Sequence, residues 1–330
     1  MGKVRCLYYD NWKDYPKKRN NKKEETFVIS KWELEKYALL NAIFNGHLLS
    51  KEGRIFYTSL YNIAIKENDN QVYVCKEDYK CAESSYKVAI SFAMGMIAAR
   101  IVAMKKYDII HMFHLKDKSI KYSPKGGKIP DWFGIDSYGN PYLFESKGTD
   151  RTSVSQEVIE EAEKQLSSIK CVTDMSGSKK KIYSSSFNKR VVVSCFRYDK
   201  TNDIRDRWYI QDVDPEGEGE IDISINLDEQ CYKQYKTVVL FMESLNTLCE
   251  EVEINQQKYI FYFYENEKLG IHKTIYDEVK SDKYTDSNKY INFYKNINEV
   301  LMEIECEKDI EDSSLYRDGI IVCSRDKTYN

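Results

Sequence analysis

The sequence IPDWFGIDSYGNPYLFESKG, residues 129–148, decides the fold that we expect for this chain. Two apolar runs, 132–135 and 142–144, lie on either side of the polar residues 137–140. Short apolar runs separated by a turn that contains glycine and asparagine are typical of a β-hairpin. The stretch therefore predicts two antiparallel strands joined by a tight turn.

The register of this hairpin decides whether its charged residues meet. With the turn centred on Tyr138, Phe133 lies opposite Leu143, and Asp131 lies opposite Glu145. A register shifted by one residue would send the two carboxylates to opposite faces. The Tyr138-centred register is therefore the structural prediction on which a functional site depends.

In this register one face of the hairpin collects acidic and basic groups. Asp131, Glu145 and Lys147 share that face because side chains alternate along a strand. Ser146 points the other way and leaves its backbone carbonyl near the carboxylates. Two carboxylates and a carbonyl suit a hard cation such as Mg²⁺ or Mn²⁺. A neighbouring lysine can orient a water molecule or neutralise charge that develops on a phosphate.

These residues resemble the motif of the PD-(D/E)xK nuclease superfamily, which has the restriction-endonuclease-like fold. Pro130-Asp131 matches the first half of the motif and Glu145-Ser146-Lys147 the second half. The resemblance implies an α/β (α+β) fold with an αβββαβ core, in which helices flank a mixed central sheet. It also implies metal-dependent phosphodiester hydrolysis, with Asp131 and Glu145 as metal ligands and Lys147 serving the attacking water.

The short triplet is not specific by itself, because 31% of the residues are charged and 78–80 and 278–280 fit it equally well. The specificity of the motif comes from the combination of the Pro-Asp pair, the hairpin-length gap, the triplet and the helix that follows. An ordinary edge hairpin with solvated charges is the alternative reading.

The flanking segments predict the rest of the core. Residues 84–106 form a helix that is apolar nearly all round, which indicates burial against a sheet. A strand at 108–115 precedes the hairpin, and a helix at about 154–169 follows it. Further strands are expected at 191–198 and 207–213. This order of helix, three strands, helix and strand is the order that the nuclease core requires.

Three further residues are candidates for the site by analogy with the superfamily. Glu83, at the start of the first core helix, is a candidate metal ligand, although a helix N-terminal charge favoured by the dipole is the preferred interpretation. Gln165, on the second core helix, is a candidate catalytic residue that faces the site, as is Lys164. His111 and His114 fall on opposite faces of a strand, which argues against a shared zinc ion.

Two groups of lysines are candidates for contacts with a nucleic-acid backbone. One group precedes the Pro-Asp pair, and the other lies in the serine- and lysine-rich segment 176–190, where a merely solvated loop is the alternative. The five lysines are Lys125, Lys128, Lys179, Lys180 and Lys181.

The length of 330 residues indicates about two domains. We expect an N-terminal extension over 1–79, the nuclease core over 80–230 and a C-terminal α/β subdomain over 231–330. In the extension, Ser30 and Glu33 predict a capping box at the start of a helix over 31–45. The run 55–65 predicts a strand.

The composition indicates a cytoplasmic protein. No apolar run reaches the roughly 18 residues of a membrane span, and the first residues lack the apolar core of a signal peptide. Nine cysteines without a C-x-x-C pair favour reduced thiols. The net charge of −3 leaves room only for a local basic rim around a nucleic-acid site.

The functional hypothesis is a Mg²⁺-dependent nuclease, expected to be a DNA endonuclease of a restriction, antiphage-defence or mobile-element system. The loop 123–128 lacks the first glycine of a P-loop, so any motor would be a partner ATPase or helicase. A homodimer is left open, as are RNA as the substrate and exonuclease activity. The alternatives are a catalytically silent nuclease-fold subunit that binds nucleic acid and an α/β protein unrelated to nucleic acid.

Overall fold

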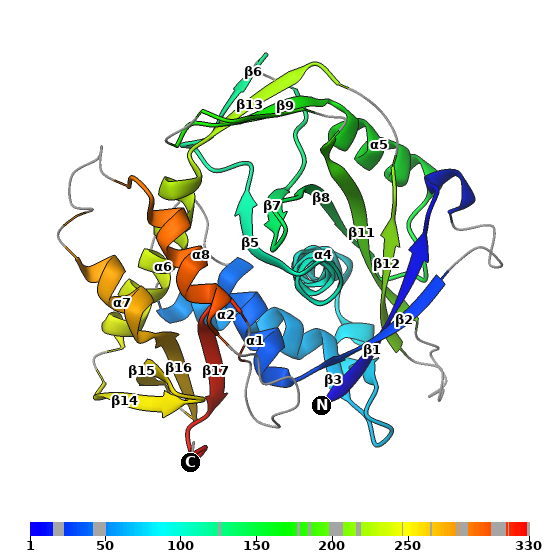
Figure 1. The fold of residues 1–330 in the computed structure, drawn as a ribbon. Coiled ribbons are helices and arrows are strands. Elements are labelled where there is room, and N and C mark those ends of the chain that lie inside the picture. The colour runs from blue at the N-terminus through cyan, green and yellow to red at the C-terminus, as the bar shows by residue number, and fades with distance from the viewer. Residues whose placement is uncertain are drawn as a thin grey trace. The chain divides into compact units, whose positions relative to one another are not determined.

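The chain forms a mixed α/β fold in which helices flank a curled mixed sheet (Figure 1). The computed structural model describes residues 1–15, 23–41, 51–124, 127–176, 179–183, 186–197, 207–215, 219–245, 247–264, 266–281, 283, 290–304, 315 and 317–328.

Two compact units make up the chain. The first comprises Met1–Ile29, Ile55–Thr173 and Lys181–Ser224, and the second Ser30–Arg54, Asp174–Lys180 and Ile225–Asn330. These boundaries differ from the three ranges expected from the sequence. The reason is long-range strand pairing, since the first two strands of the chain join the same sheet as the hairpin.

The first unit is built on a seven-stranded sheet of order β2-β1-β12-β11-β8-β7-β5. Strand β8 is parallel to β11 and β1 is parallel to β12, while the other neighbours are antiparallel. The strands are β1 Gly2–Tyr9, β2 Lys23–Ile29, β5 Ile109–His114, β7 Trp132–Asp136, β8 Pro141–Gly148, β11 Asn188–Arg197 and β12 Arg207–Val213.

Shorter elements complete this unit. A four-stranded sheet has the order β10-β9-β13-β6, and β3 pairs with β4. The bounds are η1 Trp12–Asp14, β3 Ile65–Glu67, β4 Tyr73–Cys75, α3 Glu77–Cys81, β6 Lys121–Ser123, β9 Ile169–Asp174, β10 Lys181–Tyr183 and β13 Ile221–Ile225.

Two helices cover the sheet at the hairpin. Helix α4 (Ser84–Tyr107) lies inside the curl of the sheet against β8, β11 and β5, and α5 (Gln156–Ser167) packs on β8 and β11 from outside (Figure 1). A Cβ atom added at Gly95 would lie 2.8 Å from the carbonyl oxygen of Lys147. A Cβ at Gly148 would overlap the carbonyl oxygen of Ser91. These glycines therefore let α4 approach the backbone of β8 directly.

The expected strand at 55–65 is wrong, because these residues belong mostly to helix α2 (Lys51–Ala64). Aromatic and β-branched residues suggested a strand, but Tyr57, Tyr61 and Ala64 recur at helical spacing, and the last two are buried. The spacing of the apolar residues, rather than their type, was the correct signal.

Among the residues that the structure describes, the second unit contains a four-stranded antiparallel sheet of order β14-β15-β16-β17 and the whole of helices α1, α6, α7 and α8. The capping box of α1 is confirmed, since Glu33 N–H donates to Ser30 Oγ at 3.0 Å and Ser30 N–H to Glu33 Oε2 at 2.8 Å. Residues 42–45 of the predicted helix lie outside the described residues. The bounds are α1 Lys31–Asn41, α6 Leu227–Ser244, β14 Cys249–Ile254, β15 Gln257–Tyr264, β16 Glu267–His272, α7 Lys273–Lys280, α8 Phe293–Met302 and β17 Ile320–Ser324.

Helix α4 is the one helix among the described residues that is long and apolar enough to cross a membrane. Within the fold, 72% of its most apolar window is buried. A core helix of a soluble protein has this property.

Candidate functional site

The predicted register of the hairpin is confirmed. Phe133 pairs with Leu143, as expected for a turn centred on Tyr138. The carboxylate of Asp136 fixes this turn, because it accepts hydrogen bonds from Tyr138 N–H at 2.9 Å and Asn140 N–H at 2.8 Å. Local turn chemistry therefore sets which side chains meet at the open end of the hairpin.

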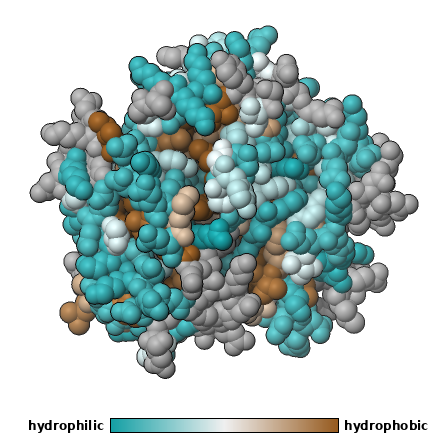
Figure 2. Space-filling model, viewed as in Figure 1, coloured by the Kyte–Doolittle hydropathy of each residue, from teal (hydrophilic) through white to brown (hydrophobic). Residues whose placement is uncertain are grey.

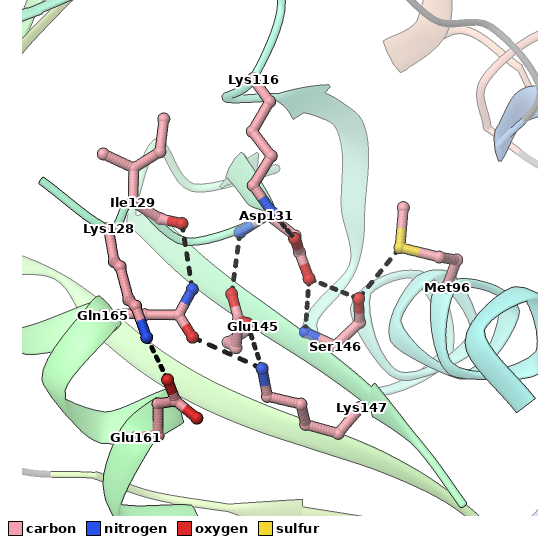
Figure 3. A network of polar contacts seen from close by, with 10 residues as sticks. All are labelled: Met96, Lys116, Lys128, Ile129, Asp131, Glu145, Ser146, Lys147, Glu161 and Gln165. Carbon is pink, nitrogen blue, oxygen red and sulfur yellow. Dashed lines mark hydrogen bonds and ion pairs between the residues drawn. The ribbon is translucent and has the colours of Figure 1, made fainter. Parts of the chain in front are cut away.

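At that open end Asp131 and Glu145 lie next to each other (Figure 3). Asp131 directly precedes β7, and its main-chain N–H donates to Glu145 Oε2 at 3.1 Å. Its carbonyl accepts from Leu115 N–H at 2.9 Å, which ties it to the end of β5. The two acidic residues are only 4% and 2% exposed. They form a buried carboxylate pair.

Asp131 is held by donors on both of its carboxylate oxygens. Lys116 Nζ lies 2.6 Å from Oδ1. Ser146 donates to Oδ2 from its N–H at 3.0 Å and from its hydroxyl at 2.6 Å. The expectation that the Ser146 side chain faces away from Asp131 is therefore wrong. Because Asp131 lies beyond the end of β7, strand alternation does not fix its side chain, which turns across β8.

Glu145 has a lysine partner of its own. Lys147 Nζ lies 2.6 Å from Glu145 Oε1 and 3.4 Å from Gln165 Oε1. Gln165, on α5, also donates from Nε2 to the carbonyl of Ile129 at 3.3 Å. Helix α5 thus places the side-chain amide of Gln165 between Lys147 and the carbonyl of Ile129, two residues before Asp131, as Figure 3 shows. The structure brings Glu145, Lys147 and Gln165 together, as expected.

The carboxyl groups of Asp131 and Glu145 have pKa values that are shifted in opposite directions. Burial raises the pKa of Glu145 to about 7, and the charge of Asp131 adds to this effect, while Lys147 opposes it. Burial also acts to raise the pKa of Asp131, but Lys116 and the donors of Ser146 outweigh it and lower the pKa. Near neutral pH Asp131 is therefore ionised while Glu145 is partly protonated, a division typical of sites for acid–base or metal chemistry.

Lys116 is a site residue that the sequence reasoning missed. Burial acts to lower its pKa, but the charge of Asp131 raises it overall. It follows β5 by two residues, and its N–H donates to His114 Nδ1 at 3.2 Å. The ring of His114 packs edge-on against Trp132 at 4.8 Å. The available signal was the position of Lys116, just beyond the strand predicted to lie beside the hairpin.

The site opens into two neighbouring pockets. The first, of about 850 Å³, is lined by Asp131, Glu145 and one face of α4. The second, of about 710 Å³, is lined by Lys118, Lys128 and Glu161 among others. Three residues border both pockets: Lys116, Lys147 and Gln165. Lys116 and Lys147 therefore lie where the two pockets adjoin.

The two carboxylates are oxygen ligands of the kind that a divalent cation takes. Lys116 and Lys147 place two positive charges on the carboxylates of Asp131 and Glu145, and one divalent cation would supply the same charge. Carboxylate oxygens are the ligands that Mg²⁺ prefers, with water completing its shell. Across the described ranges, no group of three or more His, Cys, Asp or Glu residues could hold a metal ion. A cation here would thus rest on this pair.

Glu83 does not join the site. Its carboxylate caps α4 by accepting hydrogen bonds from the Ser85 N–H at 3.0 Å and from the hydroxyls of Ser84 and Ser85. These hydrogen bonds, with the Ser85 hydroxyl contributing most, lower its pKa to about 2. Glu83 does not line the pocket that holds the carboxylate pair. The capping alternative therefore replaces the expected metal ligation.

The predicted nucleic-acid lysines have different positions. Lys128 is ion-paired with Glu161 and borders the second pocket. Lys179, Lys180 and Lys181 are exposed, and the first two belong to the second unit. Lys125 lies outside the described residues.

Comparisons with protein-family models, with curated proteins and with solved structures find no match to this chain. Any function must therefore be inferred from the residues of the site itself.

Proposed function

We propose that this protein is a Mg²⁺-dependent nuclease that hydrolyses phosphodiester bonds at the pair Asp131 and Glu145. The observation that carries the proposal is the convergence of this buried pair with Lys147 at one end of the hairpin. The resemblance to the PD-(D/E)xK superfamily, made on these same residues, favours DNA as the substrate and internal cleavage.

The order of elements supports a restriction-endonuclease-like core. Helix α4, strands β5, β7 and β8, helix α5 and strand β11 follow one another in the order αβββαβ. The intervening strands β6, β9 and β10 belong to a different sheet. The strands that carry the motif are therefore neighbours within the main sheet, with a helix on each side.

Each residue of the site has a role in the proposed reaction. A bound divalent cation supplies positive charge to the phosphate and an acidified water molecule. Asp131 and Glu145 would hold it through their carboxylate oxygens. Lys147, which Gln165 positions from α5, would orient the attacking water. Lys116 would leave Asp131 on cation binding and, bordering both pockets, contact the phosphate of the substrate.

Lysines gather at the site even though the chain is slightly acidic overall. Five lysines line the two pockets: Lys87, Lys116, Lys118, Lys128 and Lys147. Lysines that contact phosphates supply most of the non-specific affinity for nucleic acid. Five acidic residues line the same pockets, and a bound cation would offset part of their charge: Asp117, Asp131, Glu145, Asp150 and Glu161.

The wider setting is part of the proposal and rests on family analogy. It comprises a cytoplasmic restriction, antiphage-defence or mobile-element system and a partner ATPase or helicase. A homodimer is compatible with it.

One observation favours the alternative of a catalytically silent subunit that binds nucleic acid. Each carboxyl group lies within ion-pair distance of a lysine, so Lys116 and Lys147 can stabilise Asp131 and Glu145 without any metal. A protein that had lost catalysis could keep this arrangement as a structural ion-pair network. Cleavage therefore separates the two functions, whereas nucleic-acid binding does not.

The test is a cleavage panel with EDTA-stripped protein. Supercoiled plasmid, linear duplex, single-stranded DNA and RNA are incubated with Mg²⁺, Mn²⁺, Ca²⁺ or chelator. We expect cleavage of DNA with Mg²⁺ or Mn²⁺, and binding of Ca²⁺ without turnover, because its larger and looser shell positions water poorly.

The matched variants are Asp131→Asn and Glu145→Gln, with Glu157→Gln as the control. Glu157 lies on the first turn of α5 and is exposed. The site variants should lose cleavage and the control should keep it. Binding of nucleic acid without cleavage by any metal would favour the silent subunit, and neither binding nor cleavage would overturn both functions.

A further inference from the structure

The N-terminal half of α4 forms one wall of the pocket that holds the carboxylate pair. Its lining residues are Ser84, Lys87, Val88, Ser91 and Phe92. Their spacing of three and four residues places them on one face of the helix. Because Glu145 and Asp131 line the same pocket, this helix face looks onto the proposed reaction centre.

Two large apolar side chains of this wall are exposed. Phe92 is 57% exposed and Val88 is 70% exposed, whereas Met94 to Met104 of the same helix are buried. Figure 2 shows that most described residues on the face in view are hydrophilic. An exposed aromatic ring inside a concave, charged pocket is more informative than a scattered surface residue.

We propose that Phe92 stacks on an unpaired base of the substrate strand, so that the enzyme acts on nucleic acid with a single-stranded or frayed segment at the cleavage site. The inference rests on the proposed function and names its substrate class. An aromatic ring can stack on a base of any sequence, but only a base that has left its duplex neighbours can lie against it.

Charge and size support this occupant. Lys87 lies five residues before Phe92 on α4 and lines the same pocket. Lys116, just beyond β5, and Lys147, on β8, line it from the other side. A nucleotide joins an aromatic face to an anionic phosphate, so the base would lie on Phe92 while the phosphate contacts one of the three lysines. Asp131, Glu145 and Asp150 line the same pocket, so the phosphate must lie on the lysine side or at a bound cation. The volume of about 850 Å³ falls within the range of sites for small organic ligands, so the pocket has room for one nucleotide.

The experiment compares Phe92→Ala and Phe92→Trp with Tyr138→Ala. Tyr138 is the matched control, because it is an exposed aromatic residue at the hairpin turn that does not line the pocket. Binding of a short fluorescent single strand, and of the same strand in a duplex, is measured by anisotropy with Ca²⁺ in place of Mg²⁺. Cleavage of both substrates is measured with Mg²⁺.

We expect Phe92→Ala to weaken single-strand binding by about tenfold and duplex binding much less. Phe92→Trp should retain binding, and Tyr138→Ala should behave as wild type. A series of strands with one abasic position each adds a second measurement. At one position, loss of the base should weaken binding to wild type but not to Phe92→Ala, because the ring and the base then act as one contact.

Three other outcomes would overturn the base-stacking role of Phe92 or the proposed function itself. If wild type cleaves DNA while Phe92→Ala matches Tyr138→Ala on every substrate, the base-stacking role is overturned and the nuclease stands. If Phe92→Ala instead abolishes self-association without changing strand binding, the wall belongs to a second copy of the chain and the proposal is again overturned. If wild type neither binds nor cleaves nucleic acid, the proposed function itself has failed.

Discussion

The main-chain N–H of Asp131 donates a hydrogen bond to the Glu145 carboxylate at 3.1 Å. The first acidic residue of the motif thus holds the second through its backbone, while its own carboxylate stays directed to Lys116 and Ser146. A substitution of the Asp131 side chain keeps this backbone contact. Side-chain variants of Asp131 can therefore test chemistry without removing the hydrogen bond that positions Glu145.

Glu145→Gln is expected to stabilise the metal-free protein above neutral pH. The pKa of Glu145 rises from 4.5 to about 7 on folding, so between these values the unfolded chain releases a proton that the folded chain keeps. Stability from this group is present below pH 4.5 and is lost as the pH rises through 7, by at most about 3 kcal/mol. Glu145→Gln has no ionisable group at this position, so its stability does not fall in this way as the pH rises.

Urea denaturation in EDTA, at about pH 5 and about pH 8, measures this effect. The free energy of unfolding of Glu145→Gln, relative to wild type, should increase by about 1–3 kcal/mol between the two pH values. Glu157→Gln, at an exposed site, serves as the control. A difference between Glu145→Gln and wild type that does not change with pH would show that the carboxylate ionises normally.

Lys116→Met is expected to tighten Mg²⁺ binding and to slow cleavage. The ammonium of Lys116 occupies Asp131 Oδ1 in the metal-free structure, so its removal leaves a buried carboxylate without that partner. We expect Mg²⁺ affinity to rise about tenfold, since unpaired buried charges are costly. Calorimetric titration measures it, with Lys118→Met as the control on the wall of the second pocket. Unchanged or weaker Mg²⁺ binding by Lys116→Met would count against the exchange of lysine for metal.

Gly95→Ala is expected to reduce both stability and cleavage. The added methyl group would lie 2.8 Å from the main-chain carbonyl of Lys147 and would push α4 away from β8. We expect a loss of about 1–3 kcal/mol, typical of overpacking. Thermal unfolding and a cleavage assay of the same preparation measure the two effects.

Gly139→Ala is the contrasting variant, because no atom lies within 4 Å of its added methyl group but its φ is +85°. It should cost about 1–2 kcal/mol through backbone strain alone. Equal effects of the two glycine variants on cleavage would show that the contact between α4 and β8 does not position the site.

Local signals made the hairpin predictable. The turn residues and the apolar runs gave the register that pairs Phe133 with Leu143, and hence the meeting of Asp131 and Glu145. The register depends on turn chemistry and strand alternation, which a single sequence carries. Gln165 lies beside Lys147, but only the resemblance to the superfamily had made it a candidate.

Other features depend on contacts between distant segments. The pairing of β1 with β12 places the N-terminus in the main sheet, and no local pattern encodes it. Lys116 and Ser146 reach Asp131 because its side chain lies beyond the end of a strand, where packing rather than alternation sets direction. The role of Glu83 could not be decided from the sequence, because a glutamate at the start of a helix can either cap the helix or bind a metal ion.

The most direct measurement is the rate of DNA cleavage as Mg²⁺ is added to EDTA-stripped wild type, Asp131→Asn and Lys147→Met of matched purity. Wild type should be inactive in chelator and reach a maximal rate as Mg²⁺ saturates. Both variants should be folded and slower by at least about 100-fold, because each loses a group that holds the cation or the attacking water. Equal rates in wild type and the variants, or full activity of wild type with chelator present, would contradict a metal-dependent nuclease site at Asp131 and Glu145.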